Sequence, residues 1–295
     1  MGDPLISSLR FPASGDREAY LYLGPVVLVA GMATANTVHE FNTANWTLDN
    51  SFLVQLTGPG EGYEVVCPFY LVDHPEGLVV VDTGLSHDML DAPAEYGQHG
   101  AGFMEAFLPA IDYGPDMHPR ASLEDAGYAP EEVDYVVMTH LHSDHAGHMD
   151  TFPEAEFLVQ KRELRYANCP VPVQEVFYLE GDFDVLRSEE YDVTPLEGEY
   201  DVFGDGTVRT VPTPGHTPGH QSVVVELPSG PVVLAADVAH QQDGYEREHL
   251  ASFNWDLQES VRSLRKVKAM ARRTGAEVYV THDNEHIDAF EGGLE

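Results

Sequence analysis

Apolar residues along the chain fall into short runs that are bounded by Gly, Pro, Asn and Asp, a pattern typical of buried strands. The predicted strands cover residues 65–72, 77–82, 133–139, 156–160, 206–211, 221–227, 232–236 and 277–281. The turn sequences HPEG at 74–77 and LPSG at 227–230 predict hairpins.

Helical periodicity is clearest over residues 256–274, where apolar residues recur on one face: Leu257, Val261, Leu264, Val267 and Ala271. Gly275 then predicts the end of this helix. A short helix is expected at 122–126, and the Gly-, Pro- and His-rich segment 86–120 is expected to be a helical, lid-like insertion. Strands alternating with helices predict an α/β (α+β) domain of sheets covered by helices, with residues 1–295 as a single domain.

Composition agrees with a folded domain and restricts its partners. The chain has 295 residues, of which 43% are hydrophobic, and 50 acidic residues against 15 basic ones give a net charge of −35. This excess of acid excludes binding to nucleic acid or to an anionic membrane through a basic surface. Only three basic residues are Lys. Acid-rich, Lys-poor surfaces keep salt-adapted proteins hydrated, so we expect a halophilic source.

The two cysteines, Cys67 and Cys169, are too few for a disulfide framework and are expected to be buried free thiols. The N-terminal residues contain no basic segment followed by an apolar one, as a signal peptide would. We therefore expect a cytoplasmic protein.

The segment THLHSDHAGH at residues 139–148 follows a predicted strand and holds four possible metal ligands, three His and one Asp, within six residues. His140 and His142 have the spacing that places two side chains on one side of an extended segment, while Asp144 and His145 lie at a turn. Three imidazoles and one carboxylate packed together would repel and desolvate one another without a bound cation. Zinc prefers these ligands. The segment therefore predicts a metal site.

Three later residues of ligand type each follow an expected strand. His216 lies in the loop TPGHTPGH, Asp237 ends an apolar run, and His282 ends another. With these residues two sites reach a sensible coordination number. The first would use His140, His142 and His216. The second would use Asp144, His145 and His282. The two oxygens of Asp237 would bridge both metals.

These motifs, together with Asp82-Thr83-Gly84, resemble the metallo-β-lactamase superfamily in order and spacing from Asp82 to His282. The resemblance implies a four-layer αβ/βα sandwich with two Zn²⁺ ions, or other divalent metals, at the edge between the sheets. It also implies that Asp82 orients a ligand from behind the metal site. The chemistry implied is hydrolysis of an acyl bond by a hydroxide held between the metals, with Asp144 protonating the leaving oxygen.

The sequence resembles most the branch of N-acyl homoserine lactonases, over 69–84, 140–148, 157–167, 214–221 and 236–237. The expected partner is a small neutral lactone or ester, with a homodimer left open and with neither nucleic acid nor membrane. Apolar residues in 45–56 and 103–111 are candidates for an acyl-chain channel. Alternatives are a thioesterase-like hydrolase, a persulfide dioxygenase-like oxidoreductase with one iron, and a metal-binding protein without turnover.

One position departs from the lactonase pattern. Lactonases of this type carry a Tyr three residues after the bridging Asp, and His240 stands there in this chain. A His side chain can donate a hydrogen bond to a substrate carbonyl, and Tyr245 is the second candidate for that role. The lactone that is hydrolysed therefore stays open at this stage.

Overall fold

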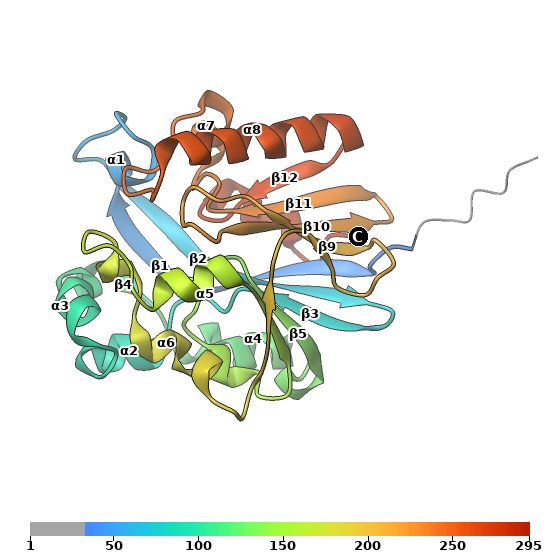
Figure 1. Ribbon diagram of the computed structural model, residues 1–295, viewed down its shortest axis with the longest axis horizontal. Coiled ribbons are helices and arrows are strands. Elements are labelled where there is room, and N and C mark those ends of the chain that lie inside the picture. Colours follow the sequence, from blue (N-terminus) through green and yellow to red (C-terminus); the bar gives the residue numbers. More distant parts are fainter. Residues whose placement is uncertain (1–32) are drawn as a thin grey trace, which may run out of the picture. The chain divides into compact units, whose positions relative to one another are not determined.

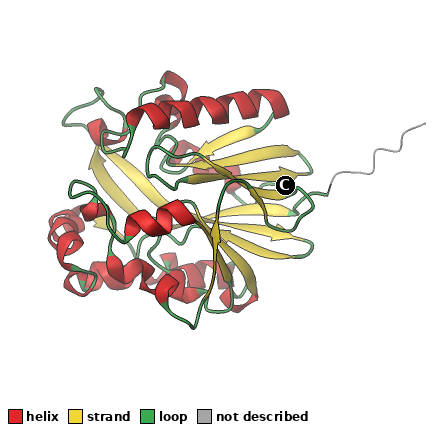
Figure 2. Cartoon of the chain, viewed as in Figure 1, coloured by secondary structure: helices red, strands yellow, loops and turns green. Residues whose placement is uncertain are grey.

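The computed structural model describes residues 33–295, which form two mixed β-sheets with helices on their outer faces (Figure 1). The part of the single-domain prediction that concerns residues 1–32 lies outside the described residues. Figure 2 shows the strands gathered between the helices.

The first sheet has seven strands in the order β4-β1-β2-β3-β5-β6-β7. Strands β1 to β3 pair antiparallel, whereas β3, β5, β6 and β7 are parallel neighbours. The strands are β1 (Thr37–Asp49), β2 (Gly62–His74), β3 (Gly77–Val81), β4 (Ile111–Asp112), β5 (Val133–Met138), β6 (Glu156–Gln160) and β7 (Asp192–Leu196).

The second sheet has five strands in the order β12-β11-β10-β9-β8, of which only β11 and β12 pair in parallel. Its strands are β8 (Tyr200–Asp201), β9 (Val208–Pro212), β10 (Gln221–Leu227), β11 (Gly230–Ala236) and β12 (Glu277–Val280).

The α-helices are α1 (Asn50–Leu53), α2 (His87–Asp91), α3 (Gln98–Phe107), α4 (Pro119–Asp125), α5 (Lys161–Ala167), α6 (Glu180–Phe183), α7 (Gln242–Arg247) and α8 (Leu257–Thr274). Short 3-10 helices are η1 (Pro93–Glu95), η2 (Leu108–Ala110), η3 (Pro115–Met117), η4 (Pro130–Glu132), η5 (Met149–Thr151), η6 (Glu175–Phe177), η7 (Asp184–Arg187) and η8 (Asn284–Phe290).

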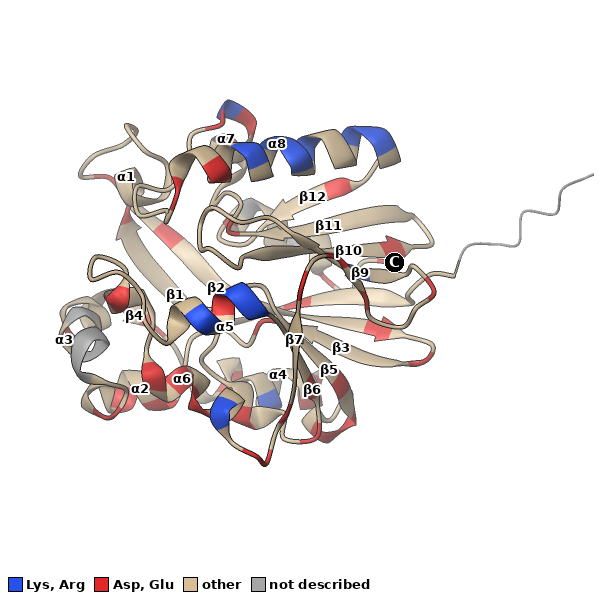
Figure 3. Cartoon of the chain, in the orientation of Figure 1, with Lys and Arg blue, Asp and Glu red and all other residues tan. Residues whose placement is uncertain are grey.

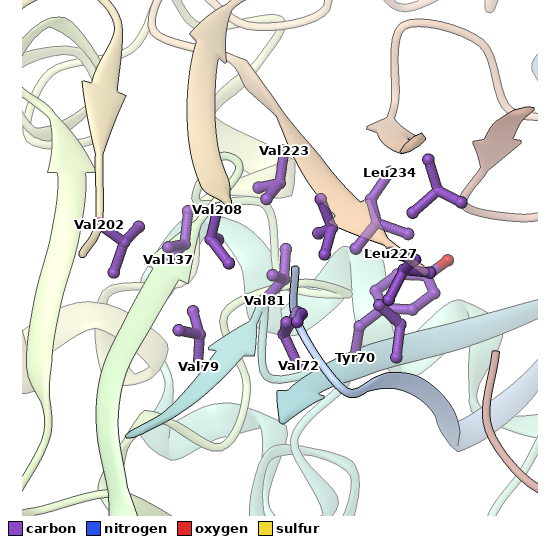
Figure 4. Close-up of a cluster of buried hydrophobic side chains, with 14 of the residues drawn as sticks. Tyr70, Val72, Val79, Val81, Val137, Val202, Val208, Val223, Leu227 and Leu234 are labelled. Atoms are coloured by element: carbon purple, nitrogen blue, oxygen red, sulfur yellow. The ribbon is translucent and has the colours of Figure 1, made fainter. Parts of the chain in front are cut away.

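Three buried apolar clusters hold four layers together. Between the sheets, valines such as Val81 and Val137 pack against Val208 and Val223 of the opposite sheet (Figure 4). On the outer face of the seven-stranded sheet, strand residues pack against α4, α5 and α6. On the outer face of the five-stranded sheet, they pack against Leu264 and Val267 of α8. The order helix, sheet, sheet, helix confirms the expected four-layer architecture.

Helix α8 shows how closely the sequence determines a boundary. The Asp256 side chain accepts hydrogen bonds from the amides of Gln258 and Glu259, which caps the helix N-terminus. Gly275 adopts φ 78° and ends the helix in the left-handed conformation that favours glycine. Leu257 is an exception to the predicted buried face, since 48% of it is exposed at the first turn.

All eight predicted strands and both hairpins are present, with ends shifted by up to three residues. The long strand β1 was missed because its sequence, TVHEFNTANWTLD, mixes polar and apolar residues. Strand β7 was also missed. The segment 86–120 is mainly helical as expected, but it also contributes strand β4, which pairs with β1.

The expectation of two buried thiols is wrong at one position. Cys67 lies buried in β2, but Cys169 is exposed. Among the described residues, no helix combines the length and the apolar character that a membrane crossing requires.

Candidate metal centre

The candidate ligands converge at one edge of the two sheets because each follows the end of a strand. The segment with His140, His142, Asp144 and His145 leaves β5, Asp237 leaves β11, and His282 leaves β12. His216 lies in the loop between β9 and β10. The backbone directly before Asp237 is strained, since Ala236 has φ 49° without being glycine. Such strain is typical of sites where a side chain must point in a defined direction.

The two oxygens of Asp237 face two different groups of imidazoles. Oδ2 lies 3.3 Å from His216 Nε2 and 3.9 Å from His140 Nε2. Oδ1 lies 3.4 Å from both His145 Nε2 and His282 Nε2. A carboxylate with this division between its two oxygens would be able to hold two metal ions, one on each side.

Each of the two groups forms a compact set of ligand atoms. In the first group, His142 Nδ1 and His216 Nε2 lie 3.0 Å apart, and His140 completes the set. In the second, Asp144 Oδ2 lies 3.5 Å from His282 Nε2 and 3.9 Å from His145 Nε2. All seven predicted ligands therefore meet here, and all but Asp144 are buried.

The atoms that point inward fit a pair of metal ions. His140 Nε2, His145 Nε2 and Asp237 Oδ1 are buried and have no hydrogen-bond partner within the described chain. Buried polar atoms without a partner are costly unless something binds them. Neutral imidazole and carboxylate are the ligands that Zn²⁺ prefers. The residues present therefore fit two divalent cations.

The pKa values of the histidines follow from burial and from their neighbours. Burial lowers the pKa of His140 and of His142, and the adjacent imidazoles lower it further. Burial also lowers the pKa of His216 to about 4. His145 differs because Asp237, Asp144 and Asp82 outweigh burial and raise its pKa. The first group is thus held as neutral imidazole, the form that binds metal.

Groups behind the ligands fix their ring orientations. Asp82 accepts a hydrogen bond from His145 Nδ1 at 2.8 Å and from the amide and hydroxyl of Thr139 at 2.7 Å. The Thr139 hydroxyl lies 3.1 Å from His140 Nδ1. Asp82 thus lies behind both groups, where the sequence analysis expected it. Its φ of 59° is a second strained position at this site.

Further supporting groups were missed by the sequence analysis. His216 Nδ1 donates to Asn254 Oδ1 at 2.9 Å, and His282 Nδ1 donates to the Val66 carbonyl at 2.7 Å. His220 Nε2 accepts from the Asp237 amide at 3.0 Å. Asn254 and Val66 carry no local signal for this role, because each comes from a distant part of the chain. His220 could have been suspected from the PGHTPGH loop.

A cavity of about 400 Å³ opens onto the cluster. Its floor contains His142, Asp144, Asp237, His240 and His282. Its walls are apolar and include Trp46, Leu48, Phe52, Leu53, Val65, Phe107, Val173, Val176, Phe177 and Phe253. Both segments that the sequence suggested for an acyl channel, 45–56 and 103–111, thus contribute wall residues.

The two candidates for the carbonyl donor are separated by the fold. His240 is buried at the cavity floor with its Nε2 3.1 Å from Asp237 Oδ2, and its ring stacks on His282. Tyr245 lies in α7 within the apolar cluster under α8, where Lys268 Nζ lies 5.1 Å from its ring centre. The structure therefore brings His240 to the metal ligands and leaves Tyr245 outside the cavity lining.

With this geometry in place, comparisons with known proteins identify the family. The sequence profile of the metallo-beta-lactamase superfamily matches residues 62–282. The chain belongs to this superfamily. It is a metal-dependent hydrolase, similar in sequence to lactonases.

Individual relatives agree with this assignment. The N-acyl homoserine lactonase AttM of Azorhizobium caulinodans is 37% identical over 236 residues, which cover 79% of this chain and 88% of AttM. An N-acyl homoserine lactonase of a Bacillus species is 31% identical, over 81% of this chain and 89% of its own length. A crystallised N-acyl homoserine lactone hydrolase, with the product N-hexanoyl-L-homoserine at its catalytic metal centre, shares the fold. Its TM-score is 0.73 at 24% identity, covering 87% of this chain and 96% of that one.

Proposed function

We propose that this protein is a dinuclear zinc hydrolase that opens the lactone ring of N-acyl homoserine lactones. The observation that carries the proposal is the apolar cavity whose floor holds two groups of metal ligands joined by Asp237. The names of its relatives, which are N-acyl homoserine lactonases, point to the same reaction.

The cavity suits a neutral ring attached to an acyl chain. Among the residues that the structure describes, none of those lining the cavity is Lys or Arg. A substrate with an additional anionic group away from the metal ligands would find no Lys or Arg to pair with there, whereas the neutral lactone needs none. The apolar walls would stabilise an acyl chain by removing its surface from water. The cavity chemistry therefore favours a lactone over an anionic ester.

Two bound Zn²⁺ ions would supply Lewis acidity toward the carbonyl and a water of lowered pKa. The chain supplies the rest of the reaction. Asp144, the most exposed of the candidate ligands with 22% of its side chain accessible, faces the cavity. Its carboxylate can take a proton from the attacking water and pass it to the ring oxygen as the ester bond breaks. Addition of water and breakage of this bond yield an acid and a free hydroxyl.

His240 is the candidate for orienting the substrate. Its Nε2 lies at the cavity floor beside Asp237, so it can reach a carbonyl placed over the metal ligands. We infer that it occupies the functional position of the tyrosine that the lactonase resemblance predicts. Tyr245 is not among the residues that line the cavity, so it has no role in this mechanism.

The test combines metal content with turnover on one preparation. We expect mass spectrometry to find two zinc ions per chain, and a pH-indicator assay to show opening of N-hexanoyl homoserine lactone. γ-Butyrolactone, which lacks the acyl chain, should be a poorer substrate. Two metals without turnover on any lactone would overturn the substrate assignment, and a single iron would overturn the dinuclear zinc site.

Asp237→Ala provides the site-specific variant for this experiment. Among the described residues it removes the one carboxylate that faces both ligand groups, so metal content and turnover should fall together. Asp243→Ala is the matched control, because Asp243 is exposed on α7 and pairs with Arg247. Full metal content in Asp237→Ala would contradict the bridging role.

A further inference from the structure

Glu163 is a fully buried carboxylate whose partners are all neutral groups. It lies in α5 and is 0% exposed. Its Oε1 accepts hydrogen bonds from the Leu141 amide at 3.1 Å and the Tyr178 hydroxyl at 3.0 Å. Its Oε2 accepts from the Thr217 hydroxyl at 2.7 Å and the Gly219 amide at 2.9 Å. Four donors thus satisfy both oxygens, which explains how the charge is tolerated in the interior.

Three of these four donors belong to the two chain segments that carry the first group of metal ligands, whereas Tyr178 follows η6. Leu141 stands between His140 and His142, and Thr217 directly follows His216. The segments come from opposite sheets, since one follows β5 and the other connects β9 to β10. Within the described chain, Glu163 hydrogen-bonds to both at once.

The approach of α5 to the second segment is possible only at a glycine. A Cβ on Gly219 would lie 2.2 Å from the Glu163 backbone nitrogen, well inside van der Waals contact. The second Gly of the PGHTPGH loop therefore permits the helix to come close enough for its carboxylate to reach the loop. The contact therefore depends on the glycine of the loop as well as on the glutamate of the helix, and the close backbone approach holds the carboxylate in place.

We propose that Glu163 is a positioning residue that sets the spacing between the His140–His142 segment and the His216 loop, and thereby the affinity of the first metal site. In the structure this spacing brings His142 Nδ1 and His216 Nε2 to 3.0 Å, close enough for both to bind one ion. The inference rests on the proposed metal site, but it does not depend on which substrate is hydrolysed.

Glu163→Gln is the informative variant because the amide keeps the size of the side chain but cannot accept hydrogen bonds at both of its terminal atoms. Each carboxylate oxygen accepts from one backbone amide, Leu141 on one side and Gly219 on the other. Whichever way the glutamine turns, its NH₂ group faces a backbone N–H that cannot reverse its role. One of the two segments must therefore shift or lose its hydrogen bond.

The measurement is metal affinity, by chelator competition with Zn²⁺ and Co²⁺, with the visible spectrum of the Co²⁺ protein as a report on ligand geometry. We expect Glu163→Gln to weaken one of the two sites by about 10- to 100-fold, as loss of groups that orient ligands does. We also expect an altered Co²⁺ spectrum. A role in folding alone would instead lower the unfolding temperature of the metal-free protein with affinity and spectrum unchanged, and would overturn the proposal.

Two further variants keep the test decisive. Thr217→Val removes one of the four hydrogen bonds at constant volume, so it should weaken the same site less and carries the test if Glu163→Gln does not fold. Glu40→Gln is the matched control at a largely buried carboxylate of β1, and should leave metal affinity unchanged.

A wild-type chain without divalent metal would overturn the proposed function as well. Two tight metals in wild type and in both Glu163→Gln and Thr217→Val would overturn this inference alone.

Discussion

At the scale of single residues, the site depends on side chains whose two polar atoms face different partners. Asp237 shows this most clearly, because one oxygen faces His216 and the other faces His145 and His282. His145 likewise directs Nε2 toward Asp237 while Nδ1 is held by Asp82. Asp237 and His145 are thus oriented before a metal binds, which lowers the cost of ordering them on binding.

His240→Phe tests the assignment of the carbonyl donor. Phenylalanine keeps the ring against Phe253 and His282 but removes the donor, so two metals should still bind. Loss of a hydrogen bond to the reacting carbonyl should raise the activation free energy by about 1–3 kcal/mol, which lowers kcat/KM about five- to 150-fold. Steady-state kinetics on one lactone measure this, with Tyr245→Phe as the control outside the cavity. Unchanged kcat/KM in His240→Phe would remove His240 from the mechanism.

Glu40 makes a second prediction at this scale, concerning stability. Burial raises its pKa from 4.5 to about 7, although the Tyr70 hydroxyl opposes the shift, and its Oε2 has no hydrogen-bond partner. The folded state therefore holds the proton more tightly than the unfolded state. Stability is full below pH 4.5 and is lost as the pH rises through 7, by on the order of 3 kcal/mol.

Glu40→Gln should remove this loss. Urea unfolding at several pH values should show the variant gaining stability on the wild type between about pH 5 and 8, by roughly 2 kcal/mol after the cost of an unpartnered amide. Below pH 4.5, where the wild-type carboxyl is protonated, the variant should be less stable by the cost of the unpartnered amide, about 1 kcal/mol. A constant difference at every pH would show that Glu40 does not titrate in this range.

At the scale of elements, the strands that end at the metal centre were predictable and the elements that shape the cavity were less so. Buried strands such as β5, β10 and β11 are nearly continuous apolar runs and stand out in the sequence. Strand β1 was missed because of its mixed polarity, although its Trp46 lies in the segment 45–56 that the sequence suggested for an acyl channel and lines the cavity.

The insertion 86–120 contributes Phe107 of α3, whose ring packs at 5.4 Å and edge-on against Trp46 in the cavity wall. Phe107→Ala should therefore weaken binding of long acyl chains more than short ones. We expect the variant to lose about 1–2 kcal/mol of binding free energy for N-decanoyl homoserine lactone, which raises its KM about 5- to 30-fold. The change for the N-butanoyl substrate should be smaller. Leu108→Ala, next in sequence and outside the lining, is the control. Equal effects on both substrates would argue against a chain-binding role for the insertion.

At the scale of the whole molecule, charge is the dominant feature. Acidic residues are spread over both sheets and their connections, while many of the basic ones lie on α8 and α5 (Figure 3). The net charge of −35 makes the compact state repel itself, and salt screens this repulsion. The halophilic source, the cytoplasmic location and the homodimer remain predictions.

Salt dependence tests the first of these. Between 0.1 M and 1 M salt the screening length falls from about 10 Å to about 3 Å, so the unfolding temperature should rise over this range. The rise should shrink as the pH is lowered, because protonated carboxylates no longer repel. Thermal scans in NaCl at two pH values measure both effects. An unfolding temperature that does not respond to salt at neutral pH would contradict the salt-adapted surface.

The sequence by itself determined the candidate ligand set, because all seven residues follow apolar strands in motifs short enough to recognise, and those motifs carried the family fold. It also determined α8, whose cap, periodicity and terminal glycine are local signals. Only the tertiary structure decided that His240 and not Tyr245 reaches the cavity, and that Glu163 joins two ligand segments. The reason is physical: periodicity and caps report contacts between near neighbours in sequence. Those two outcomes depend on how separate elements pack, which no local pattern records.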